Sequence, residues 1–269
     1  MQTEQITKMA NKALKAMGNV LHNAQRERGM ACLYLDSTGK LYANRYQTQL
    51  AHTDEAVEKF NRIASDASLL NALPEFTEAR LSDIRAQLAK LEAIRKSVLD
   101  RSVRYTQVIN DYTFTINLPL LDGMVEYAHR TPGFNTALIS AYANLLQWKE
   151  MLGRERALTS RGFYSDAFKN IEFCDRMLSL IAEQESYLTL FKSMASPAQI
   201  EIVKPAIDNA DMKAIEALHK NLKQNENADE IDKYTVETWF DLMTRSIDRL
   251  HEAEKHIVDE LTGKKGTET

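Results

Sequence analysis

The sequence predicts an all-α protein of about eight helices, built as two four-helix bundles or as one extended bundle with two related halves. Apolar residues recur at alternating spacings of three and four along most of the 269 residues, which indicates helices with one buried face. No segment shows the sustained apolar and polar alternation of a strand. A short motif, Gln25–Ala31 (QRERGMA), also has a close copy at Gly153–Thr159 (GRERALT), which suggests two related halves.

The first half contains four predicted helices. The first spans about residues 3–35 and ends at the turn-forming run Asp36-Ser37-Thr38-Gly39. The others cover about 43–70, about 76–99, and a stretch from about 101 that Pro119 interrupts, with a hinge or kink near Asp122-Gly123. Thr131-Pro132-Gly133 is the clearest break, so we expect the halves to be linked near residues 130–134.

The second half is expected to hold helices over about 134–165 and 166–194, shorter pieces up to residue 221, and a last helix over about 230–262. The last helix carries an apolar seam in alternating three and four spacing with one polar interruption, Glu254. Packing within the bundle is the favoured use of this seam, and a homodimer interface is the alternative.

Three arginines occupy inward positions of these helical patterns. Arg28 stands in a stripe otherwise formed by apolar residues from Leu14 to Leu35, and Arg156 takes the equivalent place in the second motif copy. Arg95 holds a similar position in the stripe of the third predicted helix. The two arginines of each motif are two residues apart and point to roughly opposite sides of a helix, so Arg26 and Arg154 are secondary candidates.

A buried guanidinium keeps its charge and needs a carboxylate or a bound anion. The simpler interpretation is internal ion pairing, for which Glu27, Glu150 and Glu155 are available. The sharper hypothesis is that the guanidiniums converge on one small planar anion, whose oxygens match their parallel N–H groups. Repetition of the motif on a second helix favours a clamp with one arginine from each side.

Other classes of function find little support in the sequence. The net charge of −4 argues against direct binding of nucleic acid, and no apolar run is long enough to span a membrane. The two cysteines, Cys32 and Cys174, are far apart and are expected to be free thiols in a reducing cytoplasm. The six histidines lack metal-ligand spacing and no catalytic motif is present. We therefore expect a soluble, cytoplasmic non-enzyme without metal or cofactor.

Several segments together resemble one known family. These are QRERGMACLYL, TDEAVEKF, LEAIRKSVLD followed by YTQVINDY, LLQWKEMLGRERAL and WFDLMTRSIDRL. In this order they resemble the successive motifs of the NIT domain, the nitrate- and nitrite-sensing domain of bacterial regulators. The resemblance covers essentially the whole chain, and the two arginine motifs are its most specific part.

The resemblance implies two four-helix bundles that bind nitrate or nitrite through Arg28, Arg156 and Arg95. In this family a serine commonly follows the Glu-Arg-Gly segment by one residue, whereas here Glu27-Arg28-Gly29 is followed by Met30 and Ala31, so one hydroxyl is missing. Family members usually carry an output module, and we expect residues 1–269 to form a single sensing domain without one. The resulting hypothesis is an anion sensor that signals by helix movement to an unidentified partner protein or a second copy of the chain. The alternatives are a non-sensing helical scaffold or adaptor with ion-paired arginines, and a sensor of formate, bicarbonate or chloride.

Overall fold

The computed structural model describes residues 2–71, 75–165, 167–224 and 233–263. Its first half holds α1 (Gln2–Asp36), α2 (Ala43–Ala64), α3 (Ala67–Leu70), α4 (Glu75–Leu88), α5 (Leu91–Leu99), α6 (Tyr105–Asn110), the π-helix η1 (Asp111–Asn117) and α7 (Leu118–Arg130). Its second half holds η2 (Thr136–Leu138), α8 (Ile139–Tyr164), η3 (Ala167–Lys169), α9 (Ile171–Met194), α10 (Pro197–Ile207), α11 (Ala210–Gln224) and α13 (Val236–Leu261). The described residues contain no strand, and the all-α prediction is confirmed.

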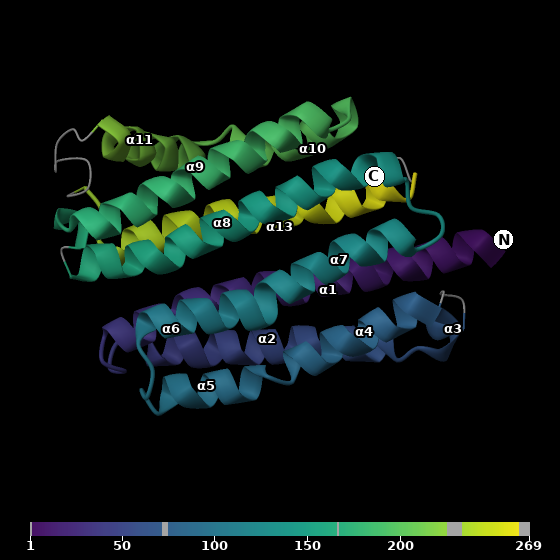
Figure 1. Ribbon diagram of the computed structural model, residues 1–269, viewed down its shortest axis with the longest axis horizontal. Coiled ribbons are helices and arrows are strands. Elements are labelled where there is room, and N and C mark those ends of the chain that lie inside the picture. The colour runs from purple at the N-terminus through teal and green to yellow at the C-terminus, as the bar shows by residue number, and fades with distance from the viewer. Residues whose placement is uncertain (1, 72–74, 166, 225–232, 264–269) are drawn as a thin grey trace.

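The helices lie in two groups, one from each half of the chain (Figure 1). The lower group contains α1 to α7, and the upper group contains α8 to α11 together with α13. The chain passes from the lower to the upper group between α7 and α8. Helices α1 and α7 contact α8, and α1 also contacts α13. We call this contact zone between α1, α7, α8 and α13 the seam.

The two arginine motifs lie in the most deeply buried parts of the molecule. In α8, every residue from Trp148 to Ser160 is buried except Arg154. Helix α1 is buried in the same way, with a nearly continuous run from Ala24 to Leu33. A helix buried on all sides has no solvent-facing stripe, so charged residues of these stretches must find partners inside the protein.

The helix boundaries depart from the sequence prediction in three places. The predicted helix over 43–70 is split at Ser65 and Asp66, and the one over 76–99 is split at Ala89 and Lys90. Pro119 does not interrupt the helical backbone, which runs from η1 directly into α7, where Pro119 is the second residue. The irregularity lies just before it, in the π-helical turn of η1. The expected start of the last helix near residue 230 lies outside the described residues.

Candidate functional site

Arg28 of α1 is fully buried at the seam and forms an ion pair across it. Its Nη1 donates to Glu150 Oε1 of α8 at 2.5 Å and to the Thr113 hydroxyl of η1 at 2.7 Å, while Nη2 lies 3.3 Å from Glu150 Oε2. Burial favours the neutral form of Glu150, but the charge and hydrogen bonds of Arg28 outweigh it and lower the pKa of that carboxyl. Glu150 is therefore an ionised carboxylate inside the protein.

Glu150 has further partners in both motif copies. Gln25 Nε2 donates to Glu150 Oε2 at 2.9 Å, and Arg154 Nε donates to Glu150 Oε1 at 3.1 Å. Arg154 is about one-fifth exposed and also lies over the Phe114 ring, 5.9 Å from its centroid. The carboxylate of Glu150 is thus shared between a buried guanidinium and one that reaches solvent.

Arg156 of α8 is the counterpart of Arg28, but its partners are neutral. Nη2 donates to the backbone carbonyl of Gln25 at 2.8 Å and Nη1 to the Thr244 hydroxyl of α13 at 3.0 Å. The guanidinium lies over the Phe240 ring, 5.2 Å from its centroid. Within the described part of the chain, no carboxylate lies within 4.0 Å of this fully buried side chain. Burial, together with the positive charges of Arg26 and Arg28, lowers the pKa of Arg156 to about 9.

The buried charges at the seam do not balance. Arg28 and Arg156 are both fully buried, and among the described residues only Arg28 has a buried carboxylate partner, Glu150, which leaves the charge of Arg156 unpaired. The remaining buried acidic and lysine side chains of α1, α8 and α13 all have charged or titratable partners: Lys149 with Glu254, Glu27 with Arg95, Glu155 with His219, and Asp36 with Arg161. An unpaired charge in such surroundings costs several kcal/mol, so this site is suited to a monovalent anion.

Each of these two guanidiniums also has an unused donor. The Nε–H groups of Arg28 and Arg156 are both buried and have no hydrogen-bond partner among the described residues. Leaving a buried donor unsatisfied costs about 1–3 kcal/mol, and native structures rarely leave such groups without a reason. The two unsatisfied Nε–H donors therefore indicate that the seam can bind a group with hydrogen-bond acceptors, such as an anion.

Glycines let the guanidiniums lie against the backbone of the opposite helix. A Cβ added at Gly153 of α8 would stand 2.8 Å from Arg28 Nη2, and one at Gly29 of α1 would stand 3.1 Å from Arg156 Nε. Each motif therefore supplies both an arginine and the glycine that accommodates the arginine of the other copy. This reciprocal packing explains why the motif occurs twice.

The other predicted arginines have different surroundings. Arg95 of α5 is half-buried and forms a bidentate ion pair with Glu27, in which Arg95 Nε and Nη2 each lie 2.8 Å from a Glu27 oxygen. Arg95 Nη1 donates to Asp54 at 2.6 Å. Its charge is thus balanced within the lower group. Arg26 is about one-third exposed and lies 3.6 Å from Asp248 of α13. The structure therefore brings Arg28, Arg154 and Arg156 together around Glu150 and Gln25, and places Arg95 in a separate cluster.

Sequence reasoning missed several residues of the seam. Thr113 and Thr244 supply hydroxyls from η1 and α13, Gln25 supplies an amide and a carbonyl, and Phe240 supplies a ring face. Gln25 carries a usable signal because it opens the first motif. The threonines carry none, since their roles depend on which helices pack at the seam.

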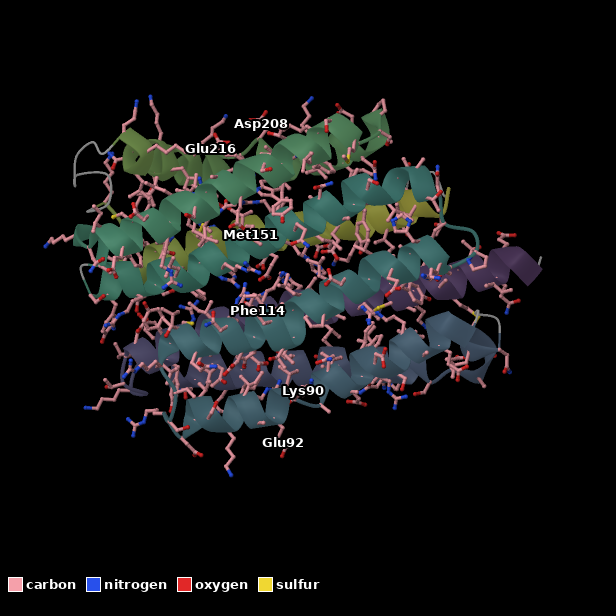
Figure 2. The ribbon with its side chains drawn as sticks, viewed as in Figure 1. Lys90, Glu92, Phe114, Met151, Asp208 and Glu216 are labelled. Carbon is pink, nitrogen blue, oxygen red and sulfur yellow. The ribbon has the colours of Figure 1, made fainter. Side chains whose placement is uncertain are left out.

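A cavity of about 280 Å³ opens beside this cluster. Its walls include Thr113, Phe114, Arg154 and Arg176, so the Arg28 partner Thr113 and the Glu150 partner Arg154 both border it. Figure 2 shows Phe114 and Met151, the sequence neighbours of Thr113 and Glu150, on opposite sides of the seam near the middle of the molecule. The cavity is partly open to solvent and is bordered by residues that contact Arg28 and Glu150.

The fold and this site define an all-helical protein in which two repeated arginine motifs face each other across a buried seam. The family model described as "Nitrate and nitrite sensing" (NIT) matches residues 19–262, and the chain belongs to this family. The nitrate- and nitrite-sensing role expected from the sequence is therefore the role of its family.

Two known proteins are similar to this chain. The nitrate regulatory protein of Klebsiella oxytoca is 24% identical over 268 residues, which cover 97% of this chain and 65% of that protein. The chain thus spans about two thirds of the relative's length. The structure of the NasR transcription antiterminator has a TM-score of 0.78 at 24% identity, over 97% of this chain and 70% of that one. At this identity the likeness establishes the shared fold, and both relatives are regulators by name.

Two further features concern metal binding and membranes. Among the described residues, no group of three or more histidine, cysteine, aspartate or glutamate side chains is placed to hold a metal ion. No helix in the described ranges has an apolar stretch long enough to cross a bilayer.

Proposed function

We propose that this protein senses nitrate or nitrite by binding the anion at the seam, between Arg28 of α1 and Arg156 of α8. The observation that carries the proposal is the charge imbalance among the described residues: Arg28 and Arg156 are both fully buried, but only Arg28 has a carboxylate partner, Glu150. One monovalent anion would neutralise the excess charge. Membership of the nitrate- and nitrite-sensing family identifies the most suitable anion.

The unpartnered Nε–H donors of the two arginines support the same binding position for the anion. Nitrate and nitrite are planar and present two or more oxygens in one plane, which suits the N–H groups of guanidiniums. The unpartnered Nε–H groups of Arg28 and Arg156 would each donate to an oxygen of the anion. The hydroxyls of Thr113 and Thr244 already contact these guanidiniums and take the place of the hydroxyl that Met30 and Ala31 cannot supply.

The remaining arginines have supporting roles in this proposal. Arg154 and Arg176 border the cavity beside the site and would attract an anion towards Arg28. Arg26 keeps its partner Asp248. Arg95 holds Glu27 and thereby orients α1, without contacting the anion.

Helix α13 is the element that would report binding. Arg156 contacts α13 through Thr244 and Phe240, so an anion that reorients this guanidinium changes the packing of α13 against α8. An anion shifts the conformation only by its difference in affinity between two helix arrangements. The altered arrangement would be read by a downstream protein or by a second copy of the chain, and the domain itself would not contact nucleic acid.

Thermal melts of the whole chain test the proposal. Nitrate and chloride are compared at equal ionic strength, since a ligand at about 100 times its Kd adds roughly 2.7 kcal/mol to the stability of the folded state. Arg156→Met should lose the response to nitrate. Arg45→Met is the matched control, because Arg45 also lies over the Phe240 ring, at 5.8 Å, but is exposed and paired with Asp241.

The outcomes separate the alternatives. A shift with nitrate and nitrite that exceeds the shift with chloride, that Arg156→Met removes and that Arg45→Met keeps, supports sensing at the seam. An equal or larger shift with formate or bicarbonate would assign the site to another small anion. No shift with any planar anion would favour a helical scaffold whose arginines serve packing alone.

A further inference from the structure

A second cationic site lies at the junction of α1, α2 and α13, away from the arginine motifs. A cavity of about 540 Å³ is lined there by five lysines: Lys8, Lys12, Lys15, Lys59 and Lys255. Three of them come from α1, one from α2 and one from α13. The walls therefore belong to both helix groups (Figure 1).

The positive charge of this cavity is largely uncompensated. Asp259 is the single carboxylate among the described residues that line it, and it is already held by Lys15 at 2.6 Å. Lys255 pairs with Glu252, which does not line the cavity. In the ranges that the structure describes, Lys8, Lys12 and Lys59 have no carboxylate within 4.0 Å. This concentration of ammonium groups occurs in a protein whose net charge is −4.

Another cavity of the same protein shows what a balanced arrangement looks like. It has a volume of about 380 Å³ and is lined by Lys220 and Lys223 together with Glu185 and Glu216. Lys223 there forms an ion pair with Glu185. Like charges that are left together repel one another. The five-lysine cavity therefore differs from this balanced cavity in having an excess of positive charge.

We propose that the five-lysine cavity binds a small molecule that carries two or more phosphate groups. Lysine ammonium groups are compact point charges on flexible stems and bind phosphate without a fixed geometry. A volume of 540 Å³ lies within the range of about 300–1,000 Å³ that is typical of small-molecule sites. Because Lys12 and Lys59 come from one helix group and Lys255 from the other, a molecule with several phosphates would bridge the two groups.

Calorimetric titration of the whole chain with inorganic tripolyphosphate at fixed ionic strength tests this proposal. The double substitution Lys12→Gln with Lys59→Gln removes two exposed lysines that lack a carboxylate partner. It should weaken tripolyphosphate binding at least tenfold. The control, Lys96→Gln with Lys192→Gln, removes the same charge from exposed positions of α5 and α9 and should stay within twofold of the wild type.

Three results would overturn the proposal. One is no binding of tripolyphosphate beyond the effect of ionic strength, and another is an equal loss in the control variant, which would indicate non-specific attraction. The third is tighter binding of a short single-stranded RNA that the Lys12 and Lys59 substitutions also abolish, which would assign the cavity to a nucleic-acid backbone. Arg156→Met should leave tripolyphosphate binding unchanged, so this test is independent of the proposed nitrate site.

Discussion

Replacing Glu150 by glutamine should tighten nitrate binding while weakening the folded protein. In the described part of the chain, Glu150 is the only carboxylate within 4.0 Å of Arg28, and Arg156 has none, so the loss of the Glu150 charge raises the local excess from one positive charge to two. Removing one partner of a buried ion pair costs about 3–5 kcal/mol of stability. The variant should therefore unfold more easily than the wild type when no anion is present.

The gain in affinity follows from the same change in charge. Two unit charges about 5 Å apart interact by about 3 kcal/mol at an effective dielectric constant of about 20. Even half of this energy, about 1.5 kcal/mol, corresponds to a Kd that is slightly more than tenfold lower. We therefore expect Glu150→Gln to bind nitrate at least tenfold more tightly, and nitrate to restore most of the lost stability.

Urea denaturation at a series of nitrate concentrations measures both effects in one experiment. The matched control is Glu155→Gln, which removes a fully buried motif carboxylate of the same helix. Glu155 contacts Gln184 Nε2 at 2.7 Å and His219 Nε2 at 2.9 Å and has no contact with Arg28 or Arg156. The Glu155→Gln variant should lose stability without a change in nitrate affinity. A folded Glu150→Gln variant with unchanged or weaker nitrate affinity would refute the charge argument.

Three further predictions concern single positions. In the absence of nitrate, Arg156→Met should raise the free energy of unfolding by about 1–4 kcal/mol, as measured by urea denaturation. A loss of stability would show that the charge of Arg156 is already compensated in the folded protein. Burial raises the pKa of Asp36 from 3.8 to about 6 despite its contact with Arg161. The folded state therefore binds this proton more tightly than the unfolded state, and the free energy of unfolding falls as pH rises from about 4 to 6. Asp36→Asn should therefore gain up to about 3 kcal/mol above pH 7 and nothing below pH 4, and a gain that does not depend on pH would contradict this origin. Gly153→Ala places a Cβ 2.8 Å from Arg28 Nη2 and should weaken nitrate binding several-fold in calorimetric titration. Alanine itself favours the helix by about 1 kcal/mol. Unchanged nitrate affinity would mean that Arg28 is free to move.

The helical nature of the chain could be predicted because it depends on local patterns. The three and four spacing around Arg28 and Arg156 places both side chains inward whatever the helices pack against, and the structure buries both. The exact ends of the helices were less predictable. The π-helical turn before Pro119 depends on hydrogen-bond register, which residue type alone does not specify.

The partners of the arginines could not be chosen from the sequence. Glu27, Glu150 and Glu155 were all available to Arg28, because each lies on a helix close to one of the motifs. In the structure Glu27 pairs with Arg95 in the lower group and Glu155 contacts His219 in the upper group. Only Glu150 crosses the seam to Arg28.

The sequence by itself determined the helical class, the repeat of the arginine motif, the inward position of Arg28 and Arg156, and the resemblance to a nitrate- and nitrite-sensing family. These properties follow from residue type and spacing along one helix. Tertiary structure alone decided that Arg156 has no carboxylate partner among the described residues and that Thr113 and Thr244 reach the guanidiniums. It also decided that five lysines from three helices line one cavity. Charge balance is a sum over neighbours in space, and the neighbours are set by the packing of helices that lie far apart in the chain.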